Sequence, residues 1–136
     1  MDDDRRREQG MKVRREVLGD AHVDRAEARR NDFNGDFQDF ITRYAWGEVW
    51  SRPGLPRHAR SLVTLALMVA LNRGDEFKMH VRAALNNGVT RDEIRELLLH
   101  TALYAGLPAA NTAYHLAEEV FGQESRIRDQ GSGKPE

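Results

Sequence analysis

The segment from Leu62 to Leu71 limits the fold of this chain most, because Thr64 is its only polar residue. A helix without a polar face belongs inside a packed domain, and this run is far shorter than the ~20 residues that span a bilayer. We therefore expect the segment to be a helix in the middle of the core. After it come the charged residues Arg73, Glu76 and His80, before apolar residues return. Charges at this place are the best candidates for a functional site.

Every patterned segment has the period of a helix, and none alternates as a half-buried strand does. Pro53, Gly54 and Pro56 interrupt the pattern near the middle of the chain. The sequence thus predicts an all-α, single-domain bundle of about six to seven helices. The predicted helices cover about residues 5–17, 23–30, 37–50, 56–72 and 76–86, a stretch from Thr90 to Gly106, and a last helix from Pro108 to about Phe121.

Several residues mark predicted helix ends. Gly74 is expected to close the apolar helix, and Asp75 to cap the helix that follows it. Gly88 is typical of a left-handed stop. Thr90 and Glu93 form a Thr-x-x-Glu capping box directly ahead of the next apolar run, which is a strong signal for a helix start.

The size and composition of the chain restrict its functions. Its 136 residues suffice for one domain with a real core, which we place at residues 5–123 between a flexible start (1–4) and a flexible tail (124–136). The lack of cysteine excludes disulfides, thiolate metal ligands and thiol redox chemistry. The 21 basic and 22 acidic residues are intermixed, so we expect no nucleic-acid partner. We also expect no membrane association and a cytoplasmic location, since a secretory signal is lacking.

Glu76 and His80 are four residues apart, so on a helix their side chains share one face. A carboxylate next to an imidazole raises the pKa of the imidazole and orients the ring, and such a pair can move a proton. Arg73 adds a positive charge that can grip a carboxylate. The alternative is a solvated ion-pair patch, because such pairs are common and contribute only about 0.3–0.5 kcal/mol. From these residues alone, the alternative is favoured.

A second group combines Trp46 and Trp50 with His58 and Arg60, which follow across the Pro/Gly break. Aromatic rings beside basic side chains could wall a pocket for a small planar anion. The competing interpretation is that the two tryptophans are core or interface anchors, and this is the more frequent outcome for paired aromatic residues.

The other histidines, His22, His100 and His115, are isolated by comparison and are expected to be packing residues. No histidine pair or carboxylate cluster has the spacing of a zinc or di-iron site, and the chain lacks the nucleotide-binding motifs. We therefore expect neither a metal nor a tightly bound cofactor.

Longer stretches carry a family resemblance, which extends over about residues 7–121. They are Gly10–Gly19, Thr42–Trp50, Leu55–Leu62 and His80–Thr90. Through them the chain resembles the carboxymuconolactone decarboxylase family. The wider superfamily includes the alkylhydroperoxidase D group, with the redox motif Cys-x-x-Cys-x-x-x-His.

Aligned on that motif, His80 matches the histidine, while Arg73 and Glu76 stand at the two cysteine positions. Peroxide reduction by that route needs a thiolate, so the resemblance excludes peroxidase activity here. Ser61 stands where that group has a further glutamate of its proton relay.

The resemblance implies a cofactor-free loss of CO₂ from the dianion 4-carboxymuconolactone, giving β-ketoadipate enol-lactone in protocatechuate catabolism. It implies catalytic roles for His80, Glu76 and Arg73, and substrate-binding roles for Arg60, His58, Trp46 and Trp50. It also implies an alkylhydroperoxidase D-like helical fold that assembles into a ring-shaped homo-oligomer, a trimer or hexamer. A non-catalytic assembly or binding protein for small organic acids, and a decarboxylase of a different lactone, are the alternatives.

Overall fold

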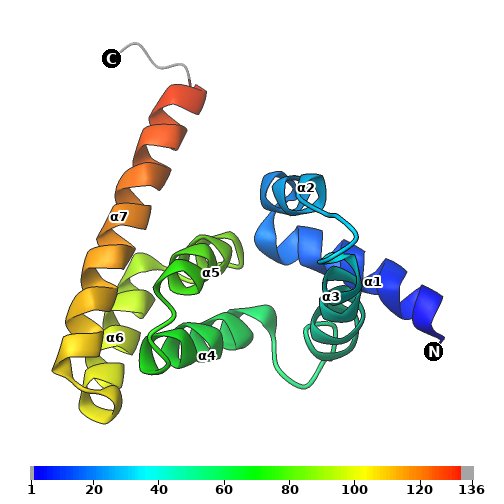
Figure 1. Cartoon of the computed structure of the whole chain (residues 1–136). Coiled ribbons are helices and arrows are strands. Elements are labelled where there is room, and N and C mark those ends of the chain that lie inside the picture. The colour runs from blue at the N-terminus through cyan, green and yellow to red at the C-terminus, as the bar shows by residue number, and fades with distance from the viewer. Residues whose placement is uncertain (1, 133–136) are drawn as a thin grey trace.

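A computed structural model describes residues 2–132, and the described part of the chain is all-helical. Figure 1 shows a first group of helices, α1 to η1, beside a second group, α4 to α7, with α5 nearest to the first group. The elements are α1 (Asp3–Leu18), α2 (Asp20–Ala28), α3 (Gly35–Phe40), the π-helix η1 (Ile41–Val49), α4 (Arg57–Ala70), α5 (Gly74–Asn86), α6 (Arg91–Ala105) and α7 (Leu107–Ser132). The predicted all-α architecture is confirmed. None of the described helices is both long enough and apolar enough to cross a membrane.

The helix expected at residues 37–50 is two elements, because α3 widens into the π-helix η1. At the transition the Thr42 hydroxyl donates a hydrogen bond to the Gln38 carbonyl (2.8 Å), a bond that competes with the regular helical ladder. At the far end the Trp50 N–H donates to the carbonyl of Ala45, five residues earlier (2.8 Å). In so short a segment, a π-helix and an α-helix give nearly the same spacing of apolar residues, so the sequence pattern could not distinguish them.

The capping predictions have mixed outcomes. Thr90 and Glu93 make the full capping box, and Gly88 and Gly106 have positive φ angles of 89° and 105°, as expected of helix stops. The predictions for Gly74 and Asp75 are wrong. Asn72 takes the left-handed turn after α4 instead (φ 58°), which an Asn side chain tolerates, and Gly74 already begins α5.

The ends of the chain differ from the predicted domain boundaries. α1 begins at Asp3, and α7 continues to Ser132, past the predicted boundary at residue 123. The expected flexible ends therefore contain helix within the described residues, and Met1 and residues 133–136 lie outside them.

The main core is formed by α4, α5, α6 and α7. Phe77 is its largest fully buried side chain, and burial of a side chain of this size stabilises the fold by roughly 1.5–3 kcal/mol. The buried members of this core are Leu65, Val69, Phe77, Val81, Ala84, Val89, Ile94, Leu98, Ala113, Ala117 and Val120.

A smaller core joins the two groups of helices. It contains Val13 and Val17 of α1, Trp46 of η1 and Ala83 of α5. Because Ala83 comes from the middle of the second group, this cluster fixes how α5 lies against α1 and η1.

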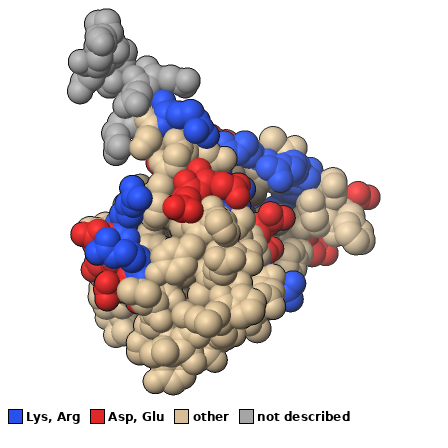
Figure 2. All heavy atoms as spheres, turned by 90° about the vertical axis from the view of Figure 1, so that its left-hand side faces the viewer, with Lys and Arg blue, Asp and Glu red and all other residues tan. Residues whose placement is uncertain are grey.

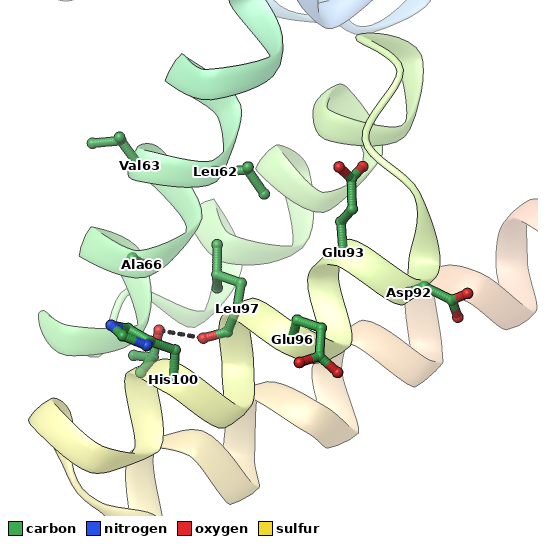
Figure 3. Close-up of a pocket in the computed structure, with 9 residues that line it drawn as sticks. Leu62, Val63, Ala66, Asp92, Glu93, Glu96, Leu97 and His100 are labelled. Carbon is green, nitrogen blue, oxygen red and sulfur yellow. Dashed lines mark hydrogen bonds between the residues drawn. The ribbon is translucent and has the colours of Figure 1, made fainter.

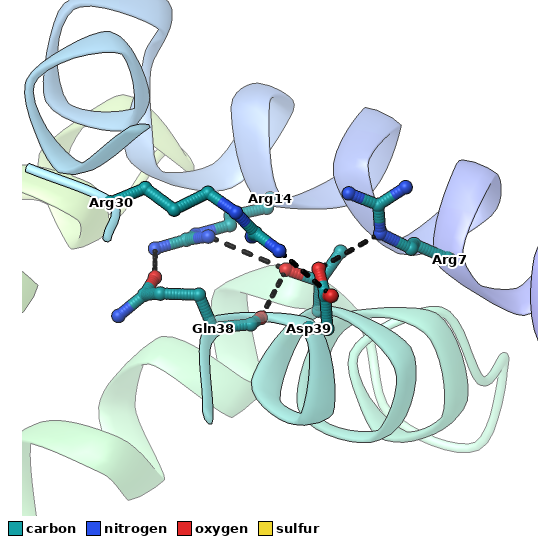
Figure 4. A network of polar contacts seen from close by, with 6 residues as sticks. Arg7, Arg14, Arg30, Gln38 and Asp39 are labelled. Atoms are coloured by element: carbon teal, nitrogen blue, oxygen red, sulfur yellow. Dashed lines mark hydrogen bonds and ion pairs between the residues drawn. The ribbon is translucent and has the colours of Figure 1, made fainter. Parts of the chain in front are cut away.

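Close approach of α1 and η1 depends on two glycines. A Cβ at Gly10 would overlap the carbonyl oxygen of Thr42, and a Cβ at Gly47 would overlap that of Arg6. Polar contacts reinforce the same junction (Figure 4). Asp39 of α3 accepts from Arg7 (3.0 Å) and Arg30 (2.8 Å). Next to it, the buried guanidinium of Arg14 donates to the Gln38 side chain (3.0 Å).

The expectation that Leu62–Leu71 lies in the middle of the core is only half right. Leu65 and Val69 are fully buried, but Val63 and Leu67 are each 51% exposed in the single chain. Neighbouring helices add to this uncovered apolar face. Its exposed members on α6 and at the start of α7 are Leu99, Leu103, Tyr104 and Leu107.

Candidate functional site

His80 lies in the middle of α5, two turns or about 10 Å along the helix axis from Arg73. Its side chain is partly buried, and Ala83, less than one turn further on, belongs to the smaller core. Glu76 lies one turn before His80 on an exposed part of the helix. The predicted placement of Glu76 and His80 on one helix is therefore confirmed.

The pKa of His80 departs from the expected direction. The pKa of His80 is lowered from 6.5 to about 4, first by burial and then by the nearby His22, and the charge of Glu76 raises it only in part. The local effect of Glu76 has the predicted sign, but desolvation of a buried imidazolium is larger. His80 is thus a neutral imidazole at pH 7.

His22 of α2 is not isolated, contrary to the sequence-based expectation. It is close enough to His80 to lower the pKa of that residue. The pKa of His22 is itself lowered, first by burial and then by the positive charges of Arg14, Arg25, Arg29 and Arg82. His22 and His80 are 58 residues apart in the sequence, so the spacing of residues within one helix could not have paired them.

Arg73 forms the N-terminal boundary of α5. Its backbone carbonyl accepts from the Phe77 N–H (2.7 Å), and its N–H donates to the Met68 carbonyl (2.9 Å). The exposed side chain lines a hollow of about 190 Å³ between α4, α5 and α7. Arg73 therefore lines a hollow between α4, α5 and α7, whereas His80 is close to His22 of the first group.

His58 and Arg60 lie in the first turn of α4. The His58 ring nitrogen Nε2 is 2.9 Å and 3.0 Å from the two carboxylate oxygens of Glu93 on α6. Arg60 donates to the Arg52 carbonyl (3.2 Å), and its Nε is buried without a hydrogen-bond partner among the described residues.

Trp46 lies on η1 and Trp50 directly follows this helix, with the two ring centroids 5.1 Å apart. Trp46 is a buried member of the smaller core, and Trp50 packs against the edge of the same cluster. Their positions agree with the packing role that the sequence alone favours. In the single chain Trp46 packs with Ala83 of α5, His58 contacts Glu93 of α6, and Arg73 lines the hollow between α4, α5 and α7.

An apolar groove runs between α4 and α6 (Figure 3). It has a volume of about 580 Å³ and its walls include Leu62, Ala66 and Leu97. The carboxylates of Asp92 and Glu96 point outward along the α6 side, and the imidazole of His100 lies at one end (Figure 3). The groove is lined by Glu93, the partner of His58, but by none of the predicted catalytic or substrate-binding residues.

Known proteins with similar sequences identify the family of this chain. Residues 35–119 match the carboxymuconolactone decarboxylase family. The chain is also 65% identical over 121 residues to a 4-carboxymuconolactone decarboxylase of Acinetobacter baylyi, a match that covers 89% of this chain and 90% of that protein. The chain belongs to the carboxymuconolactone decarboxylase family.

Two further proteins match as well. A nitrosuccinic acid decarboxylase of Metarhizium robertsii is 46% identical over 114 residues, or 84% of this chain and 80% of that protein. A 4-carboxymuconolactone decarboxylase of Pseudomonas putida is 60% identical over 48 residues, or 35% of this chain and 100% of that protein.

In this member of the carboxymuconolactone decarboxylase family, the Ser61 position holds a buried hydrogen bond. The Asn87 side chain, at the end of α5, donates to the Ser61 hydroxyl on α4 (3.1 Å). Serine is 2% exposed there and cannot act as a carboxylate base. Asn87 was missed as a site candidate, although it lies in one of the segments that carry the resemblance.

The described residues contain no group of three or more His, Asp or Glu side chains arranged to hold a metal ion. The titratable groups around α5 are imidazoles, carboxylates and guanidinium groups. They suit proton transfer and the binding of carboxylates.

Proposed function

We propose that the protein decarboxylates 4-carboxymuconolactone to β-ketoadipate enol-lactone and CO₂, without a cofactor, in protocatechuate catabolism. The 65% identity to the Acinetobacter enzyme, over 90% of that enzyme's length, is the observation that carries this proposal. The cytoplasmic location and the lack of a nucleic-acid partner remain predictions from the sequence.

The substrate itself can accept the electron pair that CO₂ leaves behind. The departing carboxylate is attached to a saturated ring carbon next to a C=C bond that is conjugated with the lactone carbonyl. When the bond to CO₂ breaks, its electrons shift the double bond and place negative charge on the carbonyl oxygen. A proton is then added at the carbon next to the carbonyl. The protein has to bind a dianion, stabilise the oxyanion and supply this proton.

His80 is our candidate for the group that faces the carbonyl oxygen or the carbon that is protonated. A neutral imidazole can donate a hydrogen bond from its N–H to the growing oxyanion. Binding of a dianion next to the ring would raise the pKa of His80, because negative charge favours the imidazolium, and would let His80 deliver a proton. Glu76 supports this by raising the pKa in the same direction.

Arg73 and Arg60 are our candidates for binding the carboxylates. A cation too close to the departing carboxylate would stabilise the substrate and slow the loss of CO₂. At least one arginine should therefore face the lactone or the second carboxylate, on the acetate side chain of the substrate. Arg60 is partly exposed in the first turn of α4, so its charge is open to a ligand from solvent. His58, Trp46 and Trp50 rank lower, as residues that shape the pocket and exclude water.

We propose further that the active protein is a ring-shaped homo-oligomer, a trimer or hexamer. The exposed apolar residues of α4 and α6 support this, since Leu103 and Tyr104 are 79% and 81% exposed in the single chain. Apolar patches of this kind commonly mark protein interfaces. In such an assembly, a second copy could complete a pocket around the candidate site residues, which lie apart from one another in a single chain.

The experiment that tests the activity is incubation of the purified protein with 4-carboxymuconolactone while CO₂ and the enol-lactone are followed. Turnover at the uncatalysed rate would refute the proposal. Nitrosuccinic acid should be assayed in parallel, because a relative with 46% identity carries that name. Turnover of nitrosuccinic acid alone would reassign the substrate and leave the reaction class unchanged.

The experiment that tests the site is the variant His80→Ala, which should lower kcat by roughly 10²–10⁴-fold if His80 transfers the proton or binds the oxyanion. The matched control is His115→Ala, at an exposed position of α7. Full activity of the His80 variant would remove His80 from the mechanism.

A further inference from the structure

A basic hollow lies where α2, α5 and the far part of α7 come together. It has a volume of about 420 Å³ and is lined by Arg25, Arg82, Gln123, Arg126 and Ile127. Figure 2 shows Lys and Arg side chains in a row across the upper part of the face that α7 occupies. The lining thus brings three arginines from three helices to one concave surface, and it includes no carboxylate.

Among the residues whose side chains the structure describes, Arg25, Arg82 and Arg126 form no ion pair, although other arginines such as Arg15 and Arg30 do. Arg82 donates instead to the neutral side chain of Gln123 (2.9 Å). This contact holds Arg82 in place and leaves its charge available.

We propose that this hollow binds a small oxyanion carrying two or more negative charges, such as phosphate or a dicarboxylate. Guanidinium groups present planar, paired N–H donors that match the oxygens of carboxylate and phosphate. A multiply charged anion can engage several arginines at once, whereas a single carboxylate satisfies only one bidentate contact. The volume lies within the range of about 300–1,000 Å³ that is usual for small-molecule sites.

The positive charge of the hollow affects His22, a nearby residue of α2. Arg25 and Arg82 are among the charges that lower the pKa of His22, and His22 lowers the pKa of His80. A bound anion would offset the charges of these two arginines. The hollow is therefore connected electrostatically to the candidate active site, although its arginines are not among the residues that we assign to the reaction.

The test is isothermal titration calorimetry of the full-length protein at pH 7.5 and constant ionic strength. Three titrants are compared: sodium phosphate, sodium malonate and sodium acetate. We expect saturable binding of phosphate or malonate and much weaker binding of acetate. Each single variant, Arg25→Gln, Arg82→Gln or Arg126→Gln, should weaken binding by about tenfold, because one charged hydrogen-bonding group is lost.

The matched control removes equal charge elsewhere through Arg5→Gln, Arg52→Gln and Arg95→Gln in one protein, and it should bind as the wild type does. Preferential binding of phosphate or of malonate identifies which class of anion the hollow takes. The proposal is overturned if neither binds saturably, or if the control weakens binding as much as a combined Arg25, Arg82 and Arg126 variant. Because the measurement follows binding, its result is independent of the proposed decarboxylase activity.

Discussion

The Nε2 atom of His58 lies 2.9 Å from Oε2 of Glu93, and this contact joins the first turn of α4 to the first turn of α6. The same carboxylate accepts the Thr90 N–H (2.8 Å) and so completes the cap of α6. Hydrogen bonds from His58 and Thr90 lower the pKa of Glu93, because they stabilise its charged form. One carboxylate therefore caps a helix and connects it to a neighbour.

The first prediction concerns this cap. Thr90→Ala removes the hydroxyl that accepts the Glu93 N–H (3.1 Å), and the free energy of unfolding should fall by about 1 kcal/mol. Urea denaturation at pH 7 measures this loss. Thr112→Ala, at an exposed position of α7, is the control and should change the free energy of unfolding far less. Equal effects of the two substitutions would contradict the assigned role of Thr90.

The second prediction concerns the crossing of α1 and η1. Gly10→Ala and Gly47→Ala each force a methyl group against a backbone carbonyl, so each should lower the free energy of unfolding by about 1–3 kcal/mol or prevent folding. Gly54→Ala serves as the control, because a Cβ there meets no atom within 4 Å. Thermal melts of the three variants give the comparison, and a wild-type melting temperature for Gly10→Ala would show that the helices are not so close.

The third prediction concerns acid stability. Between pH 6.5 and about 4 the unfolded chain protonates His80 while the folded chain does not. The contribution of His80 to the free energy of unfolding is therefore complete above pH 6.5 and is lost as the pH falls through this window, by at most about 1.4 kcal/mol per pH unit. His80→Gln should reduce the slope of stability against pH in urea denaturation.

Other groups titrate in the same range, so the informative quantity is the difference between wild type and variant. His115→Gln, at an exposed position, should retain the wild-type slope. If the wild type and His80→Gln have equal slopes, His80 is not held neutral by the fold.

The fourth prediction concerns the apolar face of α4 and α6. Leu67→Glu combined with Leu103→Glu places two charges on a surface that we expect a second copy to cover, and burying them would be costly. The variant should have a lower mass than the wild type in light scattering while keeping its helical circular dichroism. Ala28→Glu on α2 is the control. A monomeric wild type would contradict the proposed assembly.

The sequence by itself determined the helical class and several helix ends, because these depend on interactions between neighbours in the chain. Thr90 and Glu93 are three residues apart, and a side chain that caps its own helix needs no other element. Glu76 and His80 share a helix for the same reason. The family was also readable from the sequence, since long matched segments retain it.

Only the tertiary structure decided which local effect prevails. Glu76 raises the pKa of His80 as its spacing predicts, but burial and His22 from another helix lower it more. Likewise, the apolar run of α4 cannot reveal that Val63 is exposed while Leu65 is buried, because this depends on which helices pack against it. Desolvation and helix packing are properties of the assembled fold, to which residues far apart in the sequence contribute together.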